Sequence, residues 1–178
     1  MRDLQRVWKE FEANEVSHSV AHYLLAIWDS STKTQPPRAV DIARRLDVSR
    51  AAVSLQLRTL KDNGLVCVGK DHRLRLSTEG KELVRRILSK RRIIQSFLVE
   101  ILAIDEDIAE ADACKIEHLI SGETGASLAR FISFARHKRG RLDPLIREFH
   151  SMTLDCTPGI SCDFCTRDCV LRDSSSTT

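Results

Sequence analysis

Residues 39–68 read AVDIARRLDVSRAAVSLQLRTLKDNGLVCV, and this stretch decides the fold. Apolar residues at helical spacing predict a short helix over 39–46, a tight break at Asp47-Val48 and a second helix that opens at Ser49. Serine is a good residue there, because its hydroxyl can accept a hydrogen bond from a free backbone N–H of the first turn. Asn63-Gly64 ends the second helix, since glycine takes the left-handed conformation that a helix C-terminus often needs.

After Gly64 the apolar pattern changes from helical to a period of two. Leu65–Val68 and Arg73–Leu76 are predicted as two short strands, with residues 69–72 as the turn between them. Helix, tight turn, helix and β-hairpin make up a winged helix-turn-helix, whose second helix enters the major groove of DNA. The alternative is a helical pair used only for packing, and the hairpin argues against it.

The second helix separates into a buried and an exposed side. Val53, Leu57 and Leu60 should face the core. The outward residues are small or basic, which allows close approach to bases and bidentate binding of guanine by arginine. The residues expected at the base edges are Arg50, Ala51, Ser54, Leu55 and Arg58, with Ser49 at the helix start. Those expected at the phosphates are Arg44, Arg45, Lys61, Lys70 and Arg73.

The charge distribution fits this assignment. The chain has 178 residues and a net charge of +3, but residues 38–92 hold 15 Lys/Arg against six Asp/Glu. Residues 93–121 hold one lysine against seven acidic residues. A basic block suits a polyanion and an acidic block suits a cation, although solvated surfaces also carry such runs.

The whole chain is expected to be mainly α. Helical periodicity predicts further helices over 3–13, 17–28, 81–102, 107–120, 126–137 and 142–150, with a loop over 29–37. We expect a DNA-binding domain over 1–80, a helical dimerisation and metal-sensing domain over 81–150, and a cysteine-rich tail over 151–178 with a disordered end. No apolar run reaches the ~20 residues that cross a bilayer, and no secretory signal is present, so a cytoplasmic protein without a membrane partner is expected.

An acidic helix further indicates which kind of DNA-binding protein this is. Asp112-Ala-Cys-Lys-Ile-Glu-His-Leu-Ile-Ser121 resembles the metal-binding helix of the diphtheria-toxin-repressor and manganese-regulator family. Segments upstream of this helix match the family in order and spacing, namely Tyr23–Ile27, Asp41–Ala43, Val48-Ser49, Gly64–Val66 and Leu76–Gly80. The resemblance covers about residues 17–138 and implies a homodimeric repressor that binds a palindromic operator when loaded with Fe(II) or Mn(II). Apolar residues beyond the winged helix fit a dimer, namely Ile93, Ile94, Leu98, Leu102 and Phe131.

The acidic helix carries a candidate metal site. Cys114, Glu117 and His118 lie at i, i+3 and i+4, so they project from one face of a helix. Thiolate, carboxylate and imidazole together suit Fe(II), Zn(II) or Mn(II). The resemblance adds a fourth ligand from an earlier helix, at the position of His22. The alternative makes Cys114 a small core residue and His118 an ordinary hydrogen-bonded histidine.

The second metal site of the family is altered here. Its ligand positions correspond to Arg91, Gln95 and Glu110, and an arginine cannot bind a metal because its guanidinium stays protonated. We expect Arg91 and Glu110 to form an ion pair that imitates the charge balance of a filled site. The two-metal switch that the resemblance implies is therefore not expected in full.

The tail adds chemistry outside this resemblance. Cys156, Cys162, Cys165 and Cys169 lie within 14 residues, and such thiols hold a [4Fe–4S] cluster or a Zn(II) ion. Regulatory disulfides, or no ligand, are the other options. The sequence thus predicts a metal- or iron–sulfur-responsive repressor of iron or metal homeostasis genes. Alternatively, the chain is a winged-helix regulator that senses redox state, nitric oxide or a small ligand, with a structural zinc in its tail.

An enzyme is the other class of function to consider, as an iron–sulfur or zinc enzyme. Against it, the sequence has no phosphate loop, no nucleotide fingerprint and no arrangement of a nucleophile with a base. We therefore expect a protein that is not an enzyme.

Overall fold

The fold comes from a computed structural model, which describes residues 17–33 and 35–152. Contacts divide the chain into two units, residues 1–138 and 139–178. The described part of the first unit is helical except for one hairpin. Its elements are α2 (His18–Lys33), α3 (Ala39–Leu46), α4 (Arg50–Asp62), β1 (Val66–Val68), β2 (Leu74–Leu76), α5 (Thr78–Glu100), α6 (Glu106–Ile116) and α7 (Gly122–His137).

The winged helix-turn-helix that the sequence predicts is confirmed. The Oγ of Ser49 accepts a hydrogen bond from the backbone N–H of Ala52 at 3.1 Å, so serine caps α4. The core side of α4 is the predicted one, since Val53, Leu57 and Leu60 are buried. Strands β1 and β2 pair antiparallel with Val66 opposite Leu76, Cys67 opposite Arg75 and Val68 opposite Leu74.

Helix α2 is longer than predicted. The serine- and threonine-rich stretch from Asp29 was expected to be a loop, but the helix continues to Lys33. The Oγ of Ser30 donates to the Ala26 carbonyl at 2.8 Å, and the Oγ of Ser31 donates to the Ile27 carbonyl at 2.7 Å. Serine hydroxyls that bond back along the helix in this way let polar residues remain in it.

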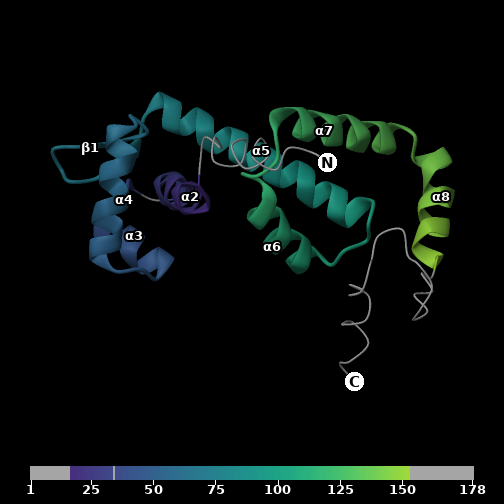
Figure 1. The fold of residues 1–178 in the computed structure, drawn as a ribbon, viewed down its shortest axis with the longest axis horizontal. Helices are drawn as coiled ribbons and strands as arrows, with labels where there is room; N and C mark the ends of the chain where they lie inside the picture. Colours follow the sequence, from purple (N-terminus) through teal and green to yellow (C-terminus); the bar gives the residue numbers. More distant parts are fainter. Residues whose placement is uncertain (1–16, 34, 153–178) are drawn as a thin grey trace, which may run out of the picture. The chain divides into compact units, whose positions relative to one another are not determined.

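Helix α5 joins the wing to the second half of the unit. It packs against α2 and β2 near its start and against α6 and α7 further along, on different sides (Figure 1). Its start is fixed at the wing, because the Ser77 N–H donates to the Leu65 carbonyl at 3.0 Å and the Ser77 Oγ caps the helix at Gly80. A Cβ at Gly80 would lie 2.2 Å from the Leu65 carbonyl oxygen, so only glycine permits this close approach.

Helix α6 ends earlier than predicted. Asp105 caps its start, where it accepts from the backbone N–H of Asp107 at 2.9 Å. The helix stops at Ile116 rather than residue 120, and Glu117 is its C-cap with a backbone still in the right-handed helical region. Glu117 and His118 therefore lie in the turn that follows α6, almost in helical register with Cys114.

The described part of the second unit is one helix, α8 (Arg139–Ser151), and none of its residues is buried. None of the described helices is long and apolar enough to cross a membrane. The expected helix over 3–13 and the tail with Cys156, Cys162, Cys165 and Cys169 lie outside the described residues.

Candidate metal centre and nucleic-acid interface

The outer face of α4 is open to solvent. Its predicted base-reading residues, Arg50, Ala51, Ser54, Leu55 and Arg58, are all exposed. Leu55 is the extreme case, with 67% of its surface exposed although it is a large apolar residue. Among the described residues, no hydrogen bond or ion pair holds Arg50 or Arg58. The arrangement leaves two arginines and an apolar side chain free to meet another surface.

The residues expected at the phosphates fall into two groups. Arg44, Lys61 and Lys70 are exposed. Arg45 instead forms an ion pair with Asp29 of α2, and Arg73 donates from Nη1 to the Pro36 carbonyl at 2.7 Å. Arg45 and Arg73 therefore also hold α2 and the wing to the rest of the domain, a role that sequence reasoning missed.

Ion pairing also shapes the wing. Asp71 accepts from both Nη atoms of Arg75, at 3.1 and 2.9 Å. The hydrogen bonds from Arg75 hold the pKa of Asp71 well below its usual range. The two side chains are 44% and 43% exposed, and an ion pair so open to solvent contributes little to the stability of the fold.

The centre of the acidic-helix site is a guanidinium group. Arg91 of α5 donates from Nε to Oε2 of Glu117 at 2.5 Å and from Nη2 to Oε1 at 2.9 Å. The same Nη2 lies 3.3 Å from the Sγ of Cys114. Glu117 is 0% exposed, and the Arg91 side chain is 22% exposed. This is a bidentate, largely buried pair that ties α5 to the end of α6.

The prediction that Arg91 forms an ion pair with Glu110 was wrong. Glu110 is exposed, and its influence on Arg91 is a longer-range attraction that adds a minor contribution to the raised pKa of that guanidinium. The hydrogen bonds to Glu117 make the main contribution to that rise in pKa. Arg91 thus neutralises a carboxylate that the sequence assigned to the metal site.

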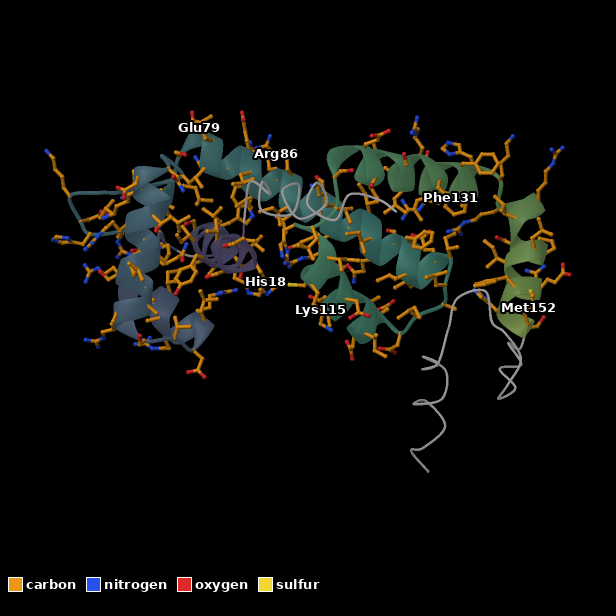
Figure 2. All side chains as sticks on the ribbon, in the orientation of Figure 1. His18, Glu79, Arg86, Lys115, Phe131 and Met152 are labelled. Carbon is orange, nitrogen blue, oxygen red and sulfur yellow. The ribbon has the colours of Figure 1, made fainter. Side chains whose placement is uncertain are left out.

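Histidines surround the other side of this site. The Nε2 of His22 lies 3.5 Å from the Sγ of Cys114, so α2 and α6 meet here as the resemblance implied. The ring of His18 is 4.3 Å from that of His22 and 4.9 Å from that of His118, measured between centroids. Figure 2 labels His18 at the end of α2 and Lys115 on the neighbouring α6. His18 was missed, although its spacing of four residues from His22 was a usable signal.

The pKa values describe a site of neutral donors. Burial lowers the pKa of both His22 and His118, and repulsion from His18 lowers each of them further. Burial raises the pKa of the Cys114 thiol, while the charge of Arg91 opposes that rise. At neutral pH these groups are two imidazoles and a protonated thiol.

The predicted metal-binding set, His22, Cys114, Glu117 and His118, does not fit a divalent ion as a whole. Both oxygens of Glu117 already accept from Arg91, and Cys114 lies against the same guanidinium. Among the residues that the structure describes, no three His, Cys, Asp or Glu side chains are already placed to hold a metal ion. Arg91 therefore engages the carboxylate and the sulfur of this set, and the imidazoles of His22 and His118 are its remaining donors.

The fold and this site define a class: a winged-helix DNA-binding domain joined through one long helix to a helical domain with a His/Cys/Glu cluster. Residues 15–74 match the iron dependent repressor N-terminal DNA binding domain, and residues 77–144 match the iron dependent repressor metal binding and dimerisation domain. The chain therefore belongs to the iron-dependent repressor family. It is also similar in sequence to the diphtheria toxin repressor.

Comparisons with individual proteins agree with this assignment to the family. The chain is 28% identical over 120 residues to the iron-dependent repressor IdeR of Mycobacterium tuberculosis. The aligned region covers 67% of this chain and 52% of IdeR. It is 31% identical over 124 residues to an uncharacterised helix-turn-helix transcriptional regulator of Methanocaldococcus jannaschii, covering 69% of this chain and 99% of the relative. Against a solved manganese-dependent transcriptional repressor in complex with manganese, the TM-score is 0.58 at 26% identity, over 65% of this chain and 53% of that one. The chain thus spans about half of IdeR.

Proposed function

We propose that this chain is a homodimeric transcriptional repressor that binds a two-fold symmetric DNA operator in response to a divalent metal ion. The exposed outer face of α4 is the observation that carries this proposal. It presents Arg50, Ser54, Leu55 and Arg58 together, which pairs guanine-reading arginines with an apolar contact for thymine methyl groups. The relatives named as an iron-dependent repressor and a manganese-dependent transcriptional repressor support the metal response, and genes of iron or metal homeostasis are the targets that we propose.

Exposed aromatic residues of α7 support the homodimer. Phe134 is 54% exposed and Phe131 is 39% exposed, and the ring of Phe131 stands edge-on to Phe97 of α5 at 6.1 Å. Of the apolar residues assigned to the dimer from sequence, Ile94 is instead buried within its own chain. The remaining aromatic surface suits a self-complementary patch, as a two-fold dimer needs.

The test is operator binding by variants of α4. An operator selected from random DNA should bind Arg50→Ala and Arg58→Ala about 5- to 150-fold more weakly than the parent, since a base-reading arginine contributes ~1–3 kcal/mol. Arg147→Ala, an exposed arginine of α8, is the control and should bind like the parent. If Arg50→Ala and Arg58→Ala bound the operator with the affinity and base preference of the parent and of Arg147→Ala, α4 would not be part of the DNA interface.

The tail remains a separate part of the proposal. Four thiols at this spacing support a [4Fe–4S] cluster or a zinc ion on Cys156, Cys162, Cys165 and Cys169, which lie outside the described residues. The measurement is iron, sulfide and zinc content of protein purified without oxygen, for the parent and for Cys162→Ala/Cys165→Ala. Equal contents in the two proteins would rule out a ligand on the tail.

A further inference from the structure

A buried carboxylate meets a guanidinium where α5 packs against the end of α6. Glu117 is the C-cap of α6 and is 0% exposed. Its Oε2 accepts a hydrogen bond from Nε of Arg91 at 2.5 Å, and its Oε1 accepts one from Nη2 at 2.9 Å. A buried carboxylate is unfavourable unless a cation balances its charge. The chain supplies that cation itself, in the side chain of Arg91.

The same guanidinium also covers the sulfur of the cluster. The Nη2 of Arg91 donates to the Sγ of Cys114 at 3.3 Å, about one turn before Glu117. One side chain thus engages two of the four donors of the predicted metal-binding set. This agrees with the finding that no three His, Cys, Asp or Glu side chains within residues 17–33 and 35–152 are placed to hold a metal ion.

The backbone around Glu117 is held as well. The Glu117 N–H donates to the Ala113 carbonyl at 2.9 Å, so the residue keeps its place at the end of the helix. The Nζ of Lys90, the neighbour of Arg91 on α5, donates to the Ile120 carbonyl at 2.8 Å, three residues further along the chain. These two contacts keep the Glu117 carboxylate beside Arg91.

Two cations cannot share this carboxylate without a large cost. A divalent ion binds a carboxylate oxygen at ~2.0–2.2 Å, which places it close to the nitrogens that already donate to Glu117. The two positive charges would repel each other strongly, because a buried site screens charges far less than water does. Arg91 cannot relieve the repulsion by losing a proton, since a guanidinium stays charged. An ion that takes Glu117 therefore has to displace Arg91 first.

We infer that Arg91 is an internal cation that competes with a divalent ion for Glu117 and keeps the cluster closed until it is displaced. The ion concentration to which the chain responds would then be set by an arginine of the chain itself. The competition goes beyond the proposed function, and only its consequence for DNA binding rests on that function.

The experiment is calorimetric titration of the full chain with manganese chloride, in a Cys162→Ser/Cys165→Ser background. Manganese prefers oxygen donors, so it reports on the carboxylate rather than on the thiols of the tail. The variant is Arg91→Gln, whose neutral side chain frees Glu117 from the competing charge. Arg92→Gln is the matched control, because Arg92 is the exposed neighbour on α5 and the same charge is lost.

Arg91→Gln should bind one manganese ion at least about 100-fold more tightly than the parent, because only the small fraction of parent chains in which Glu117 is released can bind it. Arg92→Gln should bind manganese like the parent. Equal affinity in the parent and in Arg91→Gln would show that nothing competes for Glu117. An equal gain in Arg92→Gln would show a general effect of charge, and either result would overturn the inference.

Thermal unfolding of the same proteins gives a second measurement. Manganese at ten times its dissociation constant for Arg91→Gln should raise the melting temperature of that variant and leave that of the parent unchanged. If Arg91→Gln does not fold, Arg91→Lys takes its place, because lysine keeps the charge but lacks the planar fork that binds both carboxylate oxygens. Arg91→Lys should bind manganese at least about 10-fold more tightly than the parent, and equal affinity would again overturn the inference.

Operator binding is measured separately on the same proteins, with and without manganese. Arg91→Gln should reach half-maximal manganese-dependent binding at a lower manganese concentration than the parent. Tight manganese binding by Arg91→Gln without any effect on operator affinity would contradict the proposed function and leave the competition at Glu117 standing.

Discussion

Replacing Arg91 with methionine should lower the free energy of unfolding by about 3 kcal/mol. Glu117 is 0% exposed, and both of its carboxylate oxygens accept hydrogen bonds from Arg91, at 2.5 and 2.9 Å. Removing one partner of a buried pair leaves an unpaired charge and costs roughly 3–5 kcal/mol. The lower end applies here, because the Arg91 side chain is 22% exposed and water can reach the carboxylate once the guanidinium is gone.

The assay is urea unfolding followed by circular dichroism, at one protomer concentration because a dimer's stability depends on it. Arg92→Met is the matched control, since Arg92 is the exposed neighbour on α5 and its loss should change stability by no more than about 0.5 kcal/mol. The double change Arg91→Met/Glu117→Leu removes both charges and should recover most of the loss. A stability of Arg91→Met equal to that of Arg92→Met would refute the reasoning, because it would mean that the pair contributes nothing.

Two further predictions concern the wing junction and the histidines. Gly80→Ala should weaken operator binding and lower stability, because its Cβ would collide with the Leu65 carbonyl, whereas Gly122→Ala meets nothing within 4 Å and should have little effect in the same assays. Without metal, thermal stability should fall as the pH drops below 6.5, because the pKa values of His22 and His118 are lowered in the folded chain and the unfolded chain takes up those protons first. The double variant His22→Gln/His118→Gln should show a flatter profile over the same range.

Local signals predicted the winged helix well. The buried triplet of α4, the Ser49 cap and the strand pairing of the wing are set by neighbours within a few residues, and each is found as predicted. The end of α2 was missed because the composition around Ser30 indicates a loop, whereas the hydroxyls of Ser30 and Ser31 bond back to carbonyls four residues earlier and are accommodated in the helix.

Periodicity could not predict which side chains pair with one another when they are far apart in the sequence. Glu110 and Glu117 are seven residues apart, which in the predicted helix over 107–120 places them two turns apart on the same side. Either could have faced Arg91, and Glu110 was chosen because the resemblance placed it, like Arg91, at the family's second metal site. The choice depends on where α6 packs against α5, and only the structure shows that the buried end is at Glu117. His18 was missed for a related reason, because its place in the cluster is evident only from the rings of His22 and His118 that lie beside it in the structure.

The histidine cluster lies where two parts of the first unit meet. Helix α2 packs against α3, α4 and β2, so it belongs to the body that presents the outer face of α4. His118 and Cys114 belong to α6, which α5 carries and Arg91 fastens through Glu117. The rings of His18, His22 and His118 therefore join these two parts of the unit, in addition to α5, which is fixed to the wing at Gly80. Arg91 stabilises the α5–α6 half of this arrangement through Glu117, whereas the α2–α6 half depends on the contacts of His22 with Cys114 and of His18 with His118.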